Sequence, residues 1–128
     1  DEKKSKSKIA RWQAISEAAA KQSKRAIIPK VEEVLGFKEA LKDCQKAQIK
    51  VIPYELYEGM DKTKEIISCL KPGEDVAIFI GPEGGFDEEE IQAAIKEGVE
   101  PITLGKRILR TETAGFTIMS WIMYQLEN

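Results

Sequence analysis

The chain has 128 residues, of which 42% are apolar and 33% charged, with a formal net charge of −2 and no histidine. This mix is typical of one globular domain, and the longest apolar runs, such as residues 76–80, are far too short to cross a bilayer. Two cysteines and no histidine exclude a four-ligand structural zinc site and any histidine-based catalytic relay, and we expect no metal. We expect a cytoplasmic protein, because no apolar signal-peptide segment follows the basic N-terminus.

Hydrophobic periodicity and turn residues divide the chain into alternating helices and strands. Residues 1–8 are polar, and we expect them to be flexible. The predicted elements are, in chain order, a helix at 9–23, an extended segment at 27–31, a helix at 37–47, a strand at 50–56, a short helix at 64–70, a strand at 75–80, a helix at 87–97, a short strand at 101–104 and a helix at 111–126. This alternation predicts a single α/β domain over residues 1–128, with a mainly parallel sheet and helices on both faces. Because the chain opens with a helix, we expect that an N-terminal part of the domain is missing.

Several local features refine these elements. Pro53 lies inside the strand at 50–56 and indicates an edge position or a strand end. The unbroken apolar run at 75–80 is typical of a strand that is covered on both faces. Asp87 and Glu90 form a capping-box-like pair at the start of their helix. The last helix has almost no polar face, so we expect it to be buried in the core, to form a dimer interface, or both.

The loop at 81–86, with the sequence GPEGGF, follows the strongest predicted strand and precedes a helix. Ligands of open α/β sheets bind at the carboxyl ends of strands, and glycines let a ligand approach the backbone closely. Four carboxylates at 87–90 would repel a phosphate from the helix N-terminus. We therefore expect a ligand without phosphates, such as a cationic adenosine derivative. S-adenosylmethionine meets both conditions, although this reasoning does not single out one molecule; a tight structural turn is the alternative interpretation.

A second loop at 104–114 also lies between a short strand and a helix. Its apolar pair, Ile108 and Leu109, is flanked by arginines, and such a segment can surround a flat base. The alternative is a solvated loop in which Thr111 or Thr113 caps the following helix. Charge is also uneven: residues 1–30 hold nine Lys/Arg and three Asp/Glu, which suggests an anionic partner or a merely solvated basic end.

These motifs together resemble a known family. IGPEGGF at 80–86, LGKRILRTETA at 104–114 and RWQAISEAAAKQSKRAIIPKV at 11–31 are similar to segments of the 16S ribosomal RNA uridine-N3 methyltransferases of the SPOUT superfamily. The resemblance implies an S-adenosylmethionine-dependent RNA methyltransferase domain with a deep C-terminal trefoil knot, a homodimer, and small-subunit ribosomal RNA as partner. It also implies that the family's N-terminal RNA-binding domain and the opening strand and helix of the methyltransferase domain are missing. The residues that it places against the cofactor are Gly81, Pro82, Glu83, Gly84, Gly85, Leu104, Gly105, Ile108, Leu109, Arg110 and Thr113.

For the reaction, we expect Arg110 to stabilise negative charge that grows on the uracil oxygens. Without histidine, Glu112, Glu83 or water must take the proton of the uridine nitrogen. The residues expected to contact RNA phosphates are Arg11, Lys21, Lys24, Arg25 and Arg107. Three other functions remain open: a phosphate-containing nucleotide binder, a non-catalytic RNA-binding or dimerisation module, and a SPOUT enzyme that modifies transfer RNA or a ribose 2′-hydroxyl.

Overall fold

A computed structural model describes residues 2–55 and 59–127 of the chain, which form two compact units, Asp1–Phe37 and Lys38–Asn128. Within the described residues, no helix has both the length and the apolar character that a membrane span needs. The prediction of one domain over residues 1–128 stays a prediction.

The first unit consists of helix α1, Glu2–Gln22, and the extended segment that follows it. The helix begins before the predicted start at residue 9, because the polar residues 2–8 continue its turns. The Gln13 side chain donates to the Pro29 carbonyl at 3.2 Å and accepts from the Val31 N–H at 2.7 Å. The Ser16 hydroxyl also donates to the Pro29 carbonyl, at 2.7 Å. These three bonds hold the extended segment along the helix.

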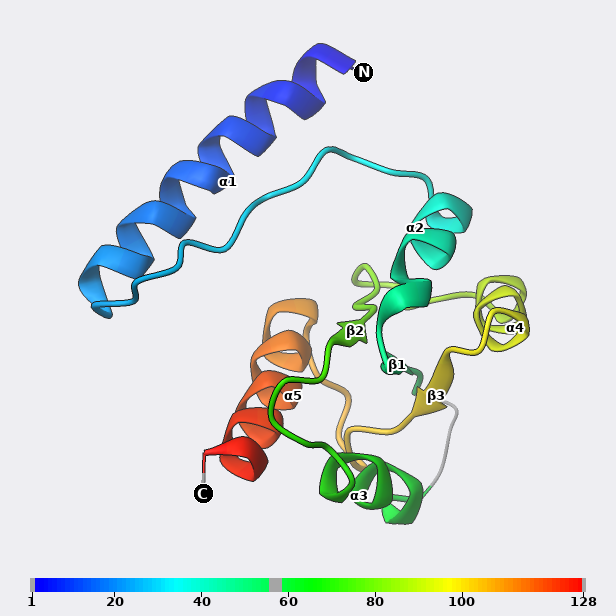
Figure 1. Ribbon diagram of the computed structural model, residues 1–128. Helices are drawn as coiled ribbons and strands as arrows, with labels where there is room; N and C mark the ends of the chain where they lie inside the picture. The colour runs from blue at the N-terminus through cyan, green and yellow to red at the C-terminus, as the bar shows by residue number, and fades with distance from the viewer. Residues whose placement is uncertain (1, 56–58, 128) are drawn as a thin grey trace. The chain divides into compact units, whose positions relative to one another are not determined.

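The second unit contains a three-stranded parallel sheet in the order β2-β1-β3 (Figure 1). Its strands are β1, Ile49–Pro53; β2, Val76–Ile78; and β3, Glu100–Ile102. The mainly parallel α/β architecture is therefore confirmed for this unit. The predicted strand at 50–56 ends at Pro53, and its last residue, 56, lies outside the described residues.

Two strand predictions are corrected by the pairing. Pro53 ends the central strand, so the strand-end interpretation is confirmed and the edge interpretation is wrong. β2 is an outer strand of the described sheet, and its residues are only partly buried. The prediction that the run at 75–80 is covered on both faces is therefore met only in part, because the residues of β2 are half-buried and not buried. The apolar run reflects the packing of β2 residues against the core. It does not indicate the position of β2 in the sheet, which depends on how the three strands pair.

Helices lie on both sides of the strands, with α3 (Asp61–Ser68) and α5 (Thr111–Leu126) on one side and α2 (Phe37–Asp43) and α4 (Glu88–Lys96) on the other (Figure 1). A 3₁₀ helix, η1 (Cys44–Lys46), continues α2. The core on the first side contains Val51, Leu70, Ile102, Ile118 and Ile122. Because successive strand residues point to opposite faces, Ile52 faces away from Val51, and it too is buried. Both faces of the central strand are thus covered.

The predicted capping box at the start of α4 is confirmed. The Asp87 carboxylate accepts from the Glu90 N–H at 2.8 Å, and the Glu90 carboxylate accepts from the Asp87 N–H at 3.0 Å. Replacing Asp87 by alanine should lower the free energy of unfolding by about 1 kcal/mol, because the cap bond is lost. Asp43 offers a matched control, since this residue precedes η1 without a side-chain cap bond. Denaturant titrations measure the free energy of unfolding of the Asp87 and Asp43 variants, and an equal decrease in both would contradict this account of the cap.

Candidate functional site

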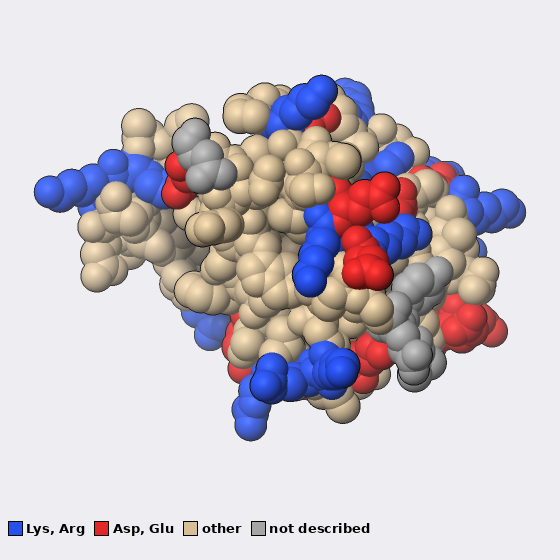
Figure 2. Space-filling model, turned by 90° about the horizontal axis from the view of Figure 1, so that it is seen from below, with Lys and Arg blue, Asp and Glu red and all other residues tan. Residues whose placement is uncertain are grey.

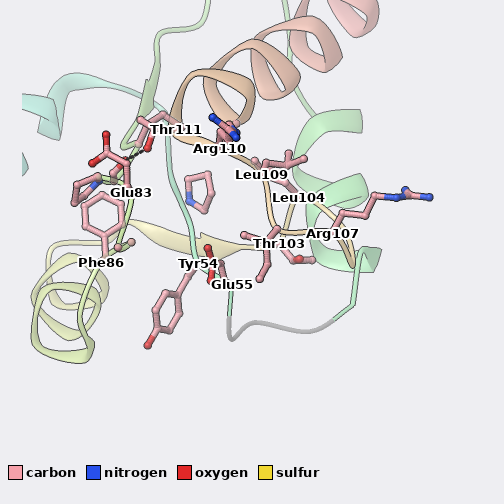
Figure 3. A pocket seen from close by; sticks show the side chains of 18 of the residues that line it. Tyr54, Glu55, Glu83, Phe86, Thr103, Leu104, Arg107, Leu109, Arg110 and Thr111 are labelled. Atoms are coloured by element: carbon pink, nitrogen blue, oxygen red, sulfur yellow. Dashed lines mark hydrogen bonds between the residues drawn. The ribbon is translucent and has the colours of Figure 1, made fainter.

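One pocket of about 920 Å³ lies at the carboxyl ends of the three strands (Figure 3). Since parallel strands end at the same edge of a sheet, the segments that follow them converge there. Each strand contributes one wall: Pro53 ends β1 and residues 54–55 follow it, residues 80–88 follow β2, and residues 103–112 follow β3, with Ala114 from α5. The two loops that sequence analysis selected therefore meet in one cavity.

Nearly all the residues predicted for the cofactor and the reaction line this pocket. They are Gly81, Pro82, Glu83, Gly84, Gly85, Leu104, Gly105, Ile108, Leu109, Arg110 and Glu112, and Arg107 from the RNA-binding set lines it too. Thr113 is exposed and does not line the pocket, whereas its neighbour Thr111 does. The remaining RNA-binding candidates, Arg11, Lys21, Lys24 and Arg25, are exposed residues of the first unit. Their binding roles stay predictions.

The start of α5 differs from the sequence prediction. Its N-cap is Arg110, which makes no side-chain cap bond, so neither threonine is the N-cap. The Thr111 hydroxyl instead donates to the Gly81 carbonyl at 2.9 Å. Thr111 lies already inside the helix, where its hydroxyl reaches a carbonyl of the neighbouring loop. This bond ties the wall that follows β3 to the wall that follows β2.

The wall at the end of β1 was not found in the sequence. The Tyr54 N–H donates to the Ile102 carbonyl of β3 at 2.9 Å, which continues the pairing past the last strand residue. The Tyr54 hydroxyl donates to the Glu88 carboxylate at 2.9 Å, and Gln92 donates to the other Glu88 oxygen at 3.0 Å. The only available signal was that Tyr54 and Glu55 follow a predicted strand, as the two selected loops do.

The bond between Tyr54 and Glu88 also determines how the tyrosine titrates. Donation to the carboxylate, with a smaller contribution from burial, raises the pKa of the Tyr54 hydroxyl above its ordinary value. A raised folded-state pKa favours the protonated form, so the stabilisation by this bond is complete below the unfolded pKa and is lost as pH rises through the folded one. The hydroxyl therefore stays a donor at neutral pH.

Glycine is required at two positions of the loop at 81–86 for different reasons. A Cβ added at Gly81 would lie 3.1 Å from the ring of Phe86, so a larger residue would displace the aromatic side chain. Gly85 has a φ of +74°, which side chains other than glycine rarely adopt. By contrast, a Cβ at Gly84 would meet nothing within 4 Å. The fold itself therefore does not require glycine at position 84.

Charge is divided between the walls of the pocket. Among the charged residues, the segments after β1 and β2 carry only acidic ones, Glu55, Glu83, Asp87 and Glu88, whereas the segment after β3 carries Lys106, Arg107 and Arg110 with one carboxylate, Glu112. The capping box occupies two N–H groups at the start of α4, which leaves fewer donors for a phosphate there. Viewed from below, the chain shows basic and acidic side chains interspersed on one face (Figure 2). The pocket suits a flat ligand with a positive charge better than a phosphate.

Residues 1–123 match the family described as the RNA methyltransferase domain. Two relatives share the name ribosomal RNA small subunit methyltransferase E. That of Mesomycoplasma hyopneumoniae is 40% identical over 113 residues, covering 88% of this chain and 47% of its own length. That of Bacillus subtilis is 38% identical over 130 residues, covering 99% of this chain and 51% of its own. The chain thus spans about half the length of these relatives.

Two solved structures of similar proteins contain a ligand. The ribosomal RNA small subunit methyltransferase E of Neisseria gonorrhoeae, bound to S-adenosyl methionine, superimposes with a TM-score of 0.80 at 32% identity, over 96% of this chain and 50% of that one. A protein of Legionella pneumophila, assigned as a methyltransferase and solved in complex with the same cofactor, gives a TM-score of 0.86 at 32% identity. This match covers 97% of this chain and 49% of the other.

Proposed function

Because the chain belongs to the RNA methyltransferase domain family, we propose that it is the cofactor-binding part of an S-adenosylmethionine-dependent enzyme that methylates N3 of a uridine in small-subunit (16S) ribosomal RNA. The observation that carries this proposal is the convergence of three strand-end segments on one pocket that is acidic on one side and basic on the other. The names of the curated relatives and the cofactor in the similar structures support the same reaction.

The proposed cofactor fits the pocket by its chemistry. Leu104, Ile108 and Leu109 offer apolar side chains to a flat adenine, and Ile108 is 79% exposed. The carboxylates of the opposite walls suit a ligand that carries a positive sulfonium and an ammonium group. A phosphate-containing nucleotide would meet the carboxylates at the start of α4 and is disfavoured.

The proposed reaction moves a methyl group from the cofactor sulfur to N3 of the target uridine. The cofactor supplies the electrophile, and the protein contributes positioning and charge. Arg110 donates hydrogen bonds to a uracil oxygen as negative charge develops there. The N3 proton leaves to Glu112, with Glu83 or water as the alternatives, and the sulfur becomes a neutral thioether.

We further propose the trefoil knot and the homodimer of the SPOUT superfamily. The first rests on the resemblance to that superfamily, which the motifs at 80–86 and 104–114 carry. An apolar face of α5 supports the second: Phe116, Met119 and Met123 are exposed at helical spacing, and Tyr124 lies beside them. Sedimentation of the full-length protein tests the dimer, which should dissociate when Phe116 is replaced by glutamate.

Gly84 provides a test of close ligand approach. Replacing Gly84 by alanine should leave the free energy of unfolding within about 0.5 kcal/mol of the original, because its Cβ meets open space. If the cofactor lies against this backbone, its affinity should fall about tenfold or more. Gly73, which has a φ of +91° and is not among the residues that line the pocket, serves as a control that loses stability instead. An unchanged cofactor affinity in the Gly84 variant would contradict close approach at this position.

The proposed RNA contacts predict a steep dependence of affinity on salt. Replacing Lys21 and Arg25 together by alanine should reduce the slope of log K against log salt by about 1.5, because two phosphate contacts are lost. Lys30, which pairs with Glu32 at 3.5 Å in the same unit, is the matched control. Equal slopes for the double variant and the original protein would remove these two residues from the RNA-binding surface.

The direct test of the reaction uses the full-length protein, unmodified ribosomal RNA and a cofactor with an isotopically labelled methyl group. Digestion to nucleosides and mass spectrometry should find the label on the base of a uridine, at N3. A label on a ribose 2′-hydroxyl, or on transfer RNA alone, would indicate another enzyme of the superfamily. Binding of RNA without transfer would indicate a non-catalytic module.

A further inference from the structure

Glu55 is a pocket carboxylate to which neither the proposed reaction nor the sequence analysis gives a role. It follows the end of the central strand β1, lines the pocket and is exposed. Within the part of the chain that the structure describes, its carboxylate makes no hydrogen bond and no ion pair. Both of its oxygens are therefore available to a ligand.

The backbone around Glu55 is held in place from two directions. The preceding residue, Tyr54, is bonded through its N–H to β3 and through its hydroxyl to Glu88 of α4. Glu55 is the next residue and forms a turn at the edge of the pocket. The Glu55 carboxylate and the apolar side chains of Leu104 and Leu109 thus line the same cavity.

This position suits one part of an adenosine cofactor. If adenine packs against Leu104 and Leu109, the polar group attached directly to the base is the ribose, with two neighbouring hydroxyl donors. A carboxylate has two acceptor oxygens, and carboxylates at strand ends recognise ribose hydroxyls in other α/β folds. The cationic end of the cofactor lies further from the base. Glu83, drawn on the other side of the pocket near Thr111, is the carboxylate placed for it (Figure 3).

We propose that Glu55 accepts hydrogen bonds from the 2′ and 3′ hydroxyls of the cofactor ribose and thereby selects a ribonucleoside over a deoxyribonucleoside. The proposal rests on the proposed function, because it presumes an adenosine cofactor in this pocket. It makes Glu55 a specificity-determining residue and Tyr54 a positioning residue that fixes the end of β1.

The experiment compares S-adenosylhomocysteine, its 2′-deoxy and 3′-deoxy analogues and 5′-methylthioadenosine by calorimetry on the full-length protein. The unmodified protein should bind S-adenosylhomocysteine about tenfold more tightly than either deoxy analogue, because a bond to a charged acceptor is lost. Replacing Glu55 by alanine should reduce this preference to less than twofold. Replacing Glu83 by alanine is the matched control. It should lower the affinity for S-adenosylhomocysteine and for its deoxy analogues by the same factor, and so leave the preference for the ribose compound unchanged. Thermal unfolding without ligand checks that both variants fold.

The outcomes separate this inference from the function on which it rests. If the unmodified protein binds all four compounds but does not distinguish ribose from deoxyribose, the inference is wrong and the proposed function stands. The Glu55 variant could lose affinity for S-adenosylhomocysteine but keep its affinity for 5′-methylthioadenosine, which lacks the amino-acid end. In that case Glu55 binds the ammonium group and the inference is wrong. If no adenosine compound binds, both proposals fail together.

Discussion

Replacing Arg110 by alanine in the full-length enzyme is expected to lower kcat by about 100- to 1000-fold. Arg110 is the N-cap of α5 and lines the pocket, where both neighbouring walls carry carboxylates. A donor aimed at charge that develops only in the transition state contributes roughly 2.7–4 kcal/mol to catalysis. Since this contribution is absent from the ground state, KM for the cofactor should change much less than kcat.

Arg107 is the matched control for this experiment. It belongs to the same loop and lines the same pocket, but we place it against RNA phosphate and not against the base. Its replacement by alanine should raise KM for RNA and leave kcat within a few-fold. Initial rates at varied RNA and cofactor concentrations separate the two effects. A kcat for the Arg110 variant within a few-fold of the original would remove Arg110 from the mechanism.

Replacing Ile118 by alanine is expected to lower the free energy of unfolding by about 3 kcal/mol. Its side chain is 0% exposed and packs in the core cluster with Val51, Ile102 and Ile122. Loss of buried methylene and methyl groups costs both their transfer free energy and the cavity that remains. Because α5 begins at the pocket, this substitution should also weaken the cofactor site indirectly.

Ile108 provides a control with the same side chain in the opposite environment. Since it is 79% exposed, its replacement by alanine should change the free energy of unfolding by less than about 0.5 kcal/mol. The same substitution should lower cofactor affinity, because Ile108 lines the pocket. Chemical denaturation without ligand measures the free energy of unfolding of both variants. Equal losses in the free energy of unfolding for the Ile118 and Ile108 variants would mean that Ile118 is not the core residue described above.

Features encoded by neighbouring residues could be predicted from the sequence. The capping box of Asp87 and Glu90 depends on residues three apart, and the loops at 81–86 and 104–114 each carry a dense local motif. Their meeting in one pocket followed from a general rule about parallel strand ends. The resemblance to a family added residue roles that the local patterns alone did not provide.

Features that depend on distant partners could not be predicted in this way. Nothing near β2 indicates that it becomes an outer strand, because that depends on how β1 pairs with β3. The local sequence predicted Thr111 as a helix cap, but its hydroxyl donates to the carbonyl of Gly81, which lies 30 residues earlier in the chain. The wall formed by Tyr54 was missed because its bonds run to Ile102 and Glu88, both far along the chain.

A calorimetric titration of the full-length protein with S-adenosylmethionine, ATP and NAD tests the nature of the pocket most directly. S-adenosylmethionine should bind at one site per chain, and the two phosphate-containing nucleotides should bind at least about 100-fold more weakly, because carboxylates surround the start of α4. Binding of ATP or NAD as tight as that of S-adenosylmethionine, or no binding of S-adenosylmethionine at all, would contradict the assignment of the pocket.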